Sequence, residues 1–221
     1  MLRIIGWIFV VILLAAVIAW FSMQSLPTWF DEESDQQDQV IEQLKTEIDR
    51  HGARQFLGKK LQQILKGELI MTEAEFNALF LASLEQDQKG REALAMTDAV
   101  KVFLHQDEVE IAIIVNLDKV EKINPKARKA VEKFDKLFFF LDGSRLSLTI
   151  FAKAVARNGQ IGVTDDFRLK VGAIPITNNT LRQLGVKVER ANQENLALKL
   201  LSIKSVELSE DQIRMGVTPR F

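Results

Sequence analysis

An uninterrupted apolar segment near the N-terminus constrains this chain more than any other feature. Residues 4–23 read IIGWIFVVILLAAVIAWFSM, with Arg3 before them and the acidic stretch 31–35 soon after them. An α-helix rises about 1.5 Å per residue, so about 20 apolar residues are enough to cross a hydrocarbon core. The segment therefore predicts a transmembrane helix, and it makes the membrane bilayer the first predicted partner.

The flanks of this segment predict its processing and its orientation. Signal peptides have a shorter apolar core and a small-residue cleavage site, whereas residues 20–25 (WFSMQS) contain no A-x-A-like triplet. Arg3 is the only Lys or Arg before Lys45, and positive flanks stay on the cytoplasmic side. We therefore expect residues 1–25 to be an uncleaved, single-pass signal anchor of the cell membrane. The N-terminus is then cytoplasmic and the main domain extracytoplasmic, on the periplasmic or outer face.

The remaining chain is divided into a short acidic juxtamembrane linker, residues 26–36, and one domain, residues 37–221. That length is ample for a single α+β domain with its own core. Trp29 either sits at the membrane interface or packs against the following helix. A net charge of −1 argues against nucleic acid as a partner, because phosphates demand a basic face. The absence of cysteine excludes disulfides, thiolate metal sites and cysteine nucleophiles.

Hydrophobic spacing predicts the order of elements. A long helix over 34–66 is expected, with a bend or a division into two helices at Gly52. Thr72-Glu73-Ala74-Glu75 is a capping-box pattern that starts a second helix. Strands follow over 99–104 and 109–117, then an amphipathic helix from Asn124-Pro125, which is basic enough either to lie on anionic headgroups or to be an ordinary solvated face.

Turn signals predict that the later strands form hairpins. Strands over 145–156 and 160–171 meet at Asn158-Gly159, the strongest short-range hairpin signal. A short helix near 179–184 and a last hairpin over 203–208 and 212–217 complete the chain. Hairpins favour antiparallel pairing, because parallel strands need crossover connections. The predicted fold class is therefore α+β, with the N-terminal transmembrane helix followed by a domain built on a strongly twisted antiparallel sheet.

No constellation for catalysis, a cofactor or a metal is apparent. His51 and His105 lie in a polar helix and a predicted turn, without the nearby nucleophile or metal partner that a general base needs. None of the nucleotide-binding, hydrolase or metalloprotease motifs is present. Asp165-Asp166 could bind a cation, but hard cations need more oxygens, and a bulge in the hairpin explains the pair better. The sequence therefore predicts a protein that is not an enzyme.

Apolar residues occur on both faces of several predicted strands. A sheet with one face in water would alternate cleanly, whereas 111–114 and 148–151 do not. Some of the additional apolar surface must be covered by helices, and some could line a groove. A solid two-layer core is the alternative that composition alone favours.

Two motifs resemble a known family. Residues 67–79 (GELIMTEAEFNAL) resemble the strand-to-helix start of the YpmS-like family of N-terminally anchored bacterial envelope proteins. Residues 167–176 (FRLKVGAIPI) are similar to that family's strand leading into a Pro corner. The resemblance implies a relation to tubular lipid-binding (TULIP-like) domains, in which a long helix is packed on a curved antiparallel sheet and an apolar groove holds acyl chains. With it, the expected fold is an α+β, TULIP-like domain that follows the N-terminal transmembrane helix.

The sequence and the resemblance together predict non-enzymatic binding of lipid or another acyl ligand in an apolar groove. An apolar groove shielded from water is sufficient for this role. The alternative is a structural or assembly partner of an envelope protein complex, with a solid core. The residues predicted to line the groove are Phe76, Phe80, Ile111, Ile113, Phe138, Leu148, Ile150 and Leu169.

Overall fold

The first part of the chain forms a series of short helices. In the computed structural model, which describes residues 27–31, 36–123, 145–164, 167–176 and 201–219, these are α2 (Thr28–Asp31), α3 (Gln36–His51), α4 (Ala53–Gly58) and α5 (Leu61–Leu65). Gly52 separates α3 from α4 with a φ of 81°, a conformation that suits glycine. Lys59 and Lys60 then close α4 with bonds to Phe56 and Leu57, three residues back, so α5 begins in a new direction.

Two further helices begin at side-chain caps. Strand β1 (Glu68–Thr72) leads into α6 (Glu73–Gln86), and Thr72 and Glu75 form the predicted capping box. Helix α7 (Gln88–Ala95) begins where the Asp87 carboxylate accepts a hydrogen bond from the Gly90 amide at 3.0 Å. Helix α8 (Leu117–Ile123) follows the second long strand and starts where Asn116 accepts from the Lys119 amide. The sequence predicts α6 correctly, but it does not reveal α7 or α8.

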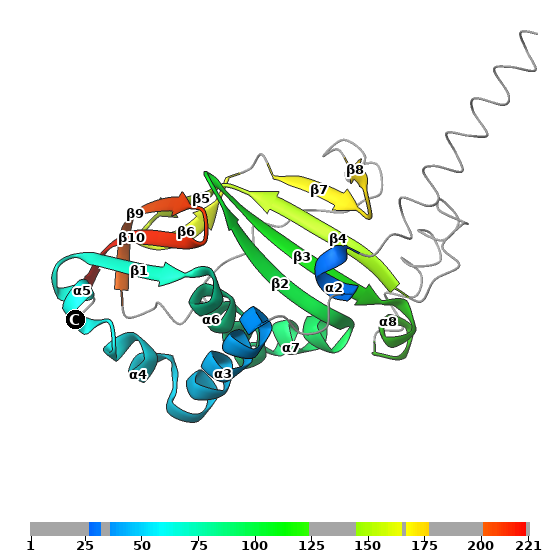
Figure 1. Cartoon of the computed structure of the whole chain (residues 1–221), viewed down its shortest axis with the longest axis horizontal. Coiled ribbons are helices and arrows are strands. Elements are labelled where there is room, and N and C mark those ends of the chain that lie inside the picture. The colour runs from blue at the N-terminus through cyan, green and yellow to red at the C-terminus, as the bar shows by residue number, and fades with distance from the viewer. Residues whose placement is uncertain (1–26, 32–35, 124–144, 165–166, 177–200, 220–221) are drawn as a thin grey trace, which may run out of the picture.

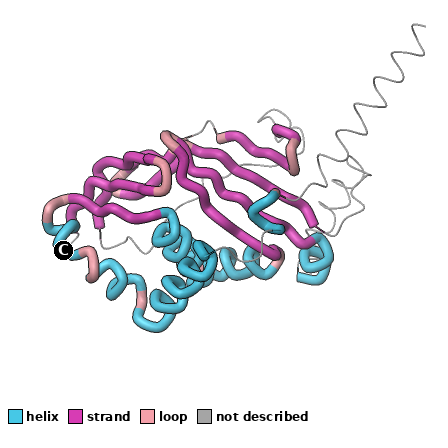
Figure 2. Tube along the Cα trace, viewed as in Figure 1, coloured by secondary structure: helices cyan, strands magenta, loops and turns pink. Residues whose placement is uncertain are grey.

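The described strands form three antiparallel sheets (Figures 1 and 2). The three-stranded sheet has the order β1-β10-β9, with β9 at Leu201–Ser209 and β10 at Gln212–Pro219. The five-stranded sheet has the order β2-β3-β4-β7-β8, and the hairpin β5-β6 forms the third sheet. Their strands are β2 (Thr97–His105), β3 (Glu108–Asn116), β4 (Arg145–Ala152), β5 (Ala154–Arg157), β6 (Gln160–Val163), β7 (Arg168–Val171) and β8 (Ile174–Ile176).

The main core lies between the helices and the three-stranded sheet. In strands β1 and β10, the inward residues Leu69, Met71, Ile213 and Met215 are fully buried and alternate with more exposed neighbours, which are polar except for Ile70 and Gly216. From the helices, Ile48, Phe56, Ile64 and Leu79 meet them, and from the five-stranded sheet Val102, Leu104 and Val109 join the same cluster. The hairpin β5-β6 contributes Ile161 and packs beside β9.

Side chains from the helical segments form hydrogen bonds with backbone groups at the outer edges of both β1 and β2. Helix α6 lies along β2, where Asn77 bonds both the carbonyl oxygen and the amide of Val102, at 2.5 and 2.6 Å. One turn earlier, the Glu73 carboxylate accepts from the Leu104 amide at 2.7 Å. On β1, Ile70 bonds Lys60 through its carbonyl and Gln63 through its amide. These contacts replace a neighbouring strand and block edge-to-edge association.

The predicted fold class is wrong. The described residues form a sheet-rich α+β structure with three sheets, not one curved sheet beneath a long helix. Gly52 and the turn at 59–60 divide the expected helix, and α3 packs on α6 instead of lying across a sheet. A break at Lys153 separates β4 from β5 and directs the hairpin into a sheet of its own. The TULIP-like arrangement implied by the family resemblance is therefore not found.

None of the helices in the described ranges is long and apolar enough to cross a bilayer. The apolar segment 4–23, the helix expected from Asn124, the pair Asp165-Asp166 and the short helix expected near 179–184 lie outside the described residues.

Candidate functional site

Strand register brings five of the eight predicted groove residues onto one face of the five-stranded sheet. Ile111 on β3 pairs with Ile150 on β4, Ile113 pairs with Leu148, and Leu169 on β7 pairs with Ile150 from the other side. Residues that are directly opposite in adjacent strands point to the same face. These five side chains therefore form one contiguous patch.

The face that carries this patch is aliphatic across all five strands, and we name it the aliphatic face. Apart from Thr97 at the start of β2, which pairs with Val115, the other positions that the register places on it are occupied by aliphatic side chains: Val100, Val102, Leu104, Val109, Val115, Leu146, Ala152, Val171, Ile174 and Ile176. Such a face must be covered by something apolar, because exposed aliphatic area of this extent is unfavourable in water.

Helix α6 covers only the part of the aliphatic face nearest its own edge. Val102, Leu104 and Val109 belong to the main core with Phe76, and both Phe80 and Ile111 pack against that core. Since α6 runs along the edge strand β2 and strands are about 4.8 Å apart, a helix about 10 Å wide spans roughly two strands. Phe76, Phe80 and Ile111 are thus part of the core beneath α6.

The other predicted residues lie beyond the reach of α6. Ile113, Leu148, Ile150 and Leu169, which we name the outer patch, are half-buried and do not pack on the core cluster. Their neighbours Leu146 and Val171 on the same face are buried, with 6% and 2% of their surfaces exposed. The outer patch therefore lies in a mostly apolar environment of its own. Phe138, the eighth predicted residue, lies outside the described residues.

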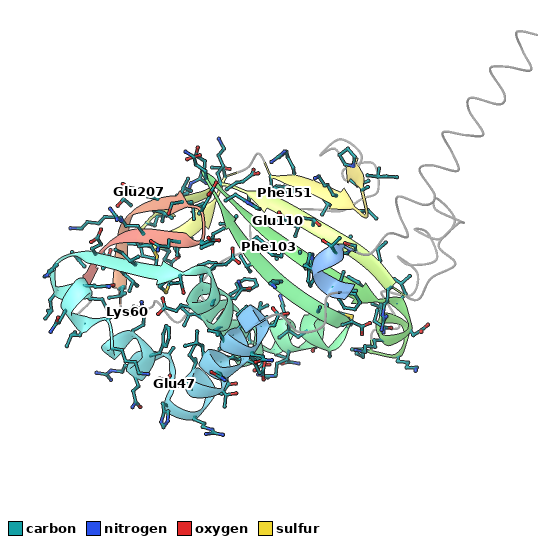
Figure 3. The ribbon with its side chains drawn as sticks, viewed as in Figure 1. Glu47, Lys60, Phe103, Glu110, Phe151 and Glu207 are labelled. Atoms are coloured by element: carbon teal, nitrogen blue, oxygen red, sulfur yellow. The ribbon has the colours of Figure 1, made fainter. Side chains whose placement is uncertain are left out.

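The opposite face of the same sheet carries aromatic and charged side chains beside the buried Ala112 and Ile114. Phe103, Glu110, Phe151 and Arg168 form one row across four strands, and the first three are labelled in Figure 3. Arg168 bonds both oxygens of Glu108 at 2.8 and 2.6 Å, and its guanidinium stacks 4.9 Å from the centre of the Phe151 ring. The Arg168–Glu108 pair and the Arg168–Phe151 stack thus hold charged side chains against this face, whereas the aliphatic face carries none.

Helix α2 lies over this aromatic face. The Trp29 ring meets the Phe103 ring edge-on at 6.0 Å, and the Arg145 guanidinium lies 5.4 Å from the centre of the Phe30 ring. At the start of α3, Asp38 pairs with the buried Lys101 at 2.8 Å. For Trp29 the expected alternatives were the membrane interface and packing against the following helix, whereas the ring contacts Phe103 on β2.

Asp98 organises the end of the sheet near α8. Its carboxylate accepts hydrogen bonds from Lys119 at 2.8 Å, Arg145 at 2.7 Å and Asn116 at 3.1 Å. The bond from Lys119, supported by those from Asn116 and Arg145, lowers the pKa of Asp98 to about 2, although burial acts in the opposite direction. The cluster ties α8 and the first residues of β2 and β4 together.

A hollow of about 600 Å³ lies on the surface of α3. Polar side chains of that helix line it, and none of the predicted groove residues is among them: Gln39, Glu42, Gln43, Thr46, Glu47, Arg50 and His51. This open hollow is shallow and lies on one helix, so it does not enclose a ligand as an acyl site would.

Neither of the two histidines belongs to a metal-binding group among the described residues. His51 is exposed on α3, and His105 pairs with Glu110 at 2.7 Å on the surface. No group of three His, Asp or Glu side chains that could hold a metal is found in the described part of the chain.

Comparison of the chain with protein-family models, with curated proteins and with solved structures finds no match. Function must therefore be inferred from the chemistry and geometry of the site.

Proposed function

We propose that this protein binds a lipid or another acyl ligand at the outer patch of the aliphatic face, in a role that involves no covalent step. The observation that supports the proposal is the continuation of an unbroken aliphatic face beyond the part that α6 covers. An acyl chain needs apolar surface with little access to water and few polar partners. Ile113, Leu148, Ile150 and Leu169 provide such a surface.

In the same proposal, the apolar segment 4–23 holds the domain at a membrane, where lipids are available. Arg3 on its N-terminal side favours placing the domain outside the cytoplasm. Protease added to intact spheroplasts should then remove the residues beyond 25 while an N-terminal tag survives. Protection of residues 31–221 would contradict this location.

Photolabelling tests the acyl site directly. The full chain in mild detergent is exposed to a photoactivatable fatty acid, and labelled peptides are identified by mass spectrometry. We expect labels on β4 and β7, and a severalfold loss of labelling in Ile113→Trp and Ile150→Trp, because an indole fills the space that the acyl chain needs. Phe151→Trp is the matched control, since its side chain lies on the opposite face of the same strand.

The stability of the same variants separates a site from a packed interior. A face that accepts a ligand also accepts the larger side chain, so the midpoint of thermal unfolding should stay close to that of the wild type. In a close-packed interior, overpacking costs about 1–3 kcal/mol. Tryptophan variants that are destabilised to this extent, together with a wild-type protein that takes no label on β4 or β7, would refute the acyl site.

A second function, as an assembly partner in an envelope complex, is favoured by the polar hollow on α3. If α3 contacts another protein, photo-crosslinkers placed at Gln43 and Thr46 should capture a discrete partner in intact cells. A crosslinker at Gln86, which is exposed at the end of α6, is the control. Equal crosslinking at all three positions would indicate no specific partner.

A further inference from the structure

The most basic segment in the described part of the chain coincides with its most exposed leucines. Residues 53–67 (ARQFLGKKLQQILKG) contain four basic side chains and no acidic one, whereas the whole chain has a net charge of −1. Within this segment, Leu61 and Leu65 are 53% and 70% exposed. They stand one helical turn apart on α5, so they point outward together.

This exposure is not a consequence of a loosely held helix. Ile64, between the two leucines, is buried in the main core. Lys60 and Gln63 hold the edge of β1 through Ile70, at 2.9 and 3.2 Å. These contacts hold α5 in place. Figure 1 shows α5 beside the start of β1, at one end of the long axis of the labelled elements.

The charges around the leucines are incompletely neutralised. Lys59 pairs with Glu47, and Lys60 pairs with Glu75 at 2.8 Å (Figure 3 labels Glu47 and Lys60). Arg54 and Lys66 are exposed and form no salt bridge with any described residue. Exposed leucines beside unpaired cations are the combination by which helices lie on anionic lipid headgroups.

We propose that α5 and its flanks form a membrane-contact surface that inserts Leu61 and Leu65 into the interface of an anionic bilayer, with Arg54 and Lys66 on the headgroups. The surface is separate from the outer patch, so the inference does not depend on the proposed acyl site. An acidic protein surface and a second copy of this chain are the competing occupants.

The absence of cysteine makes the test straightforward, because a single introduced thiol can be labelled alone. The full chain carrying Leu65→Cys is labelled with an environment-sensitive fluorophore and reconstituted into vesicles of phosphatidylcholine, with or without phosphatidylglycerol. We expect a blue shift and quenching by spin-labelled lipid in the anionic vesicles only. At about 1 M salt, where the Debye length is about 3 Å, the quenching should be lost. Val40→Cys, at another exposed apolar residue but on α3, should show neither change.

Charge reversal tests the cations. In the Leu65→Cys protein, Arg54→Glu with Lys66→Glu should weaken partitioning of the probe into anionic vesicles at least about tenfold, since each basic residue near such a surface contributes several-fold to binding. Lys89→Glu, exposed on α7, is the matched control. Equal spectra in neutral and anionic vesicles, or no quenching in either, would overturn the proposal. A shift that appears in detergent alone and grows with protein concentration would instead identify a second copy and overturn it equally.

Discussion

Asn77 offers the sharpest test of how this fold protects its sheet edge. Its side chain is 1% exposed and donates to the carbonyl oxygens of Val102, at 2.5 Å, and Glu73, at 3.1 Å, while it accepts from the Val102 amide at 2.6 Å. Truncation to alanine leaves the amide and the carbonyl of Val102 without partners at a buried edge. Each unsatisfied group costs about 1–3 kcal/mol, so with two such groups Asn77→Ala should lower the free energy of unfolding by about 2–6 kcal/mol.

The measurement is urea unfolding of the full chain in mild detergent, followed by circular dichroism. For a domain of this size, each kcal/mol of lost stability lowers the melting temperature by about 2–4 °C. Gln86→Ala, at an exposed position of the same helix, is the control and should change stability by no more than about 0.5 kcal/mol. An Asn77→Ala loss below about 1 kcal/mol would refute the reasoning, because it would mean that water or another group satisfies Val102.

Three further predictions concern other local contacts. The folded pKa of Asp98 is lowered to about 2 from an unfolded value near 3.9, so the stability that this carboxylate contributes is present above about pH 5 and is lost as pH falls toward 2. Asp98→Asn should remove about 1–2 kcal/mol of this pH-dependent stability. The measurement is urea unfolding of both proteins at pH 5 and at pH 3. Gly90→Ala should destabilise by more than about 2 kcal/mol, since a Cβ there would overlap the Leu84 carbonyl, whereas Gly58→Ala, with nothing within 4 Å, should be neutral or stabilising by up to about 1 kcal/mol. Thr72→Ala should cost about 1 kcal/mol through loss of the capping box, and a fall in stability no larger than that of a nearby exposed substitution such as Gln62→Ala would contradict this role.

Local patterns in the sequence predicted local structure well. The capping box at Thr72 depends on residues three apart, and it is confirmed. The turn at Asn158-Gly159 needs two residues with positive φ, which Asn and Gly tolerate, and it has φ values of 52° and 75°. The predicted groove residues Ile111, Ile113, Leu148, Ile150 and Leu169 share one face, because residues two apart in a strand point to the same side by geometry alone.

Pairings between distant segments could not be predicted in this way. Strand β1 at 68–72 pairs with β10 at 212–219, and no local signal connects them. The break at Lys153 likewise reflects the need of β5 to reach β9, since the preceding strand pattern continues without a turn residue. Asn77 did carry a signal, because an amide within the apolar helix segment Phe76–Leu79 must find partners if it is buried. Which partners it finds depends on the tertiary fold.

The site shows the same division between local and distant causes. Phe76 and Phe80 lie on an apolar helix face that the sequence reveals. They are part of the core because α6 lies along β2, and the sequence does not reveal this position. The same two hydrogen-bonding residues, Glu73 and Asn77, that protect the edge of β2 also keep α6 over the first two strands. A helix held at the edge cannot also cover β4 and β7, so protection of the edge leaves the outer patch to another apolar occupant. Removing the hydrogen bonds of Asn77 to Val102 should therefore loosen α6 from the edge of β2 without altering the aliphatic residues on β4 and β7. Photolabelling of the outer patch should then persist in an Asn77→Ala protein that remains folded at low temperature.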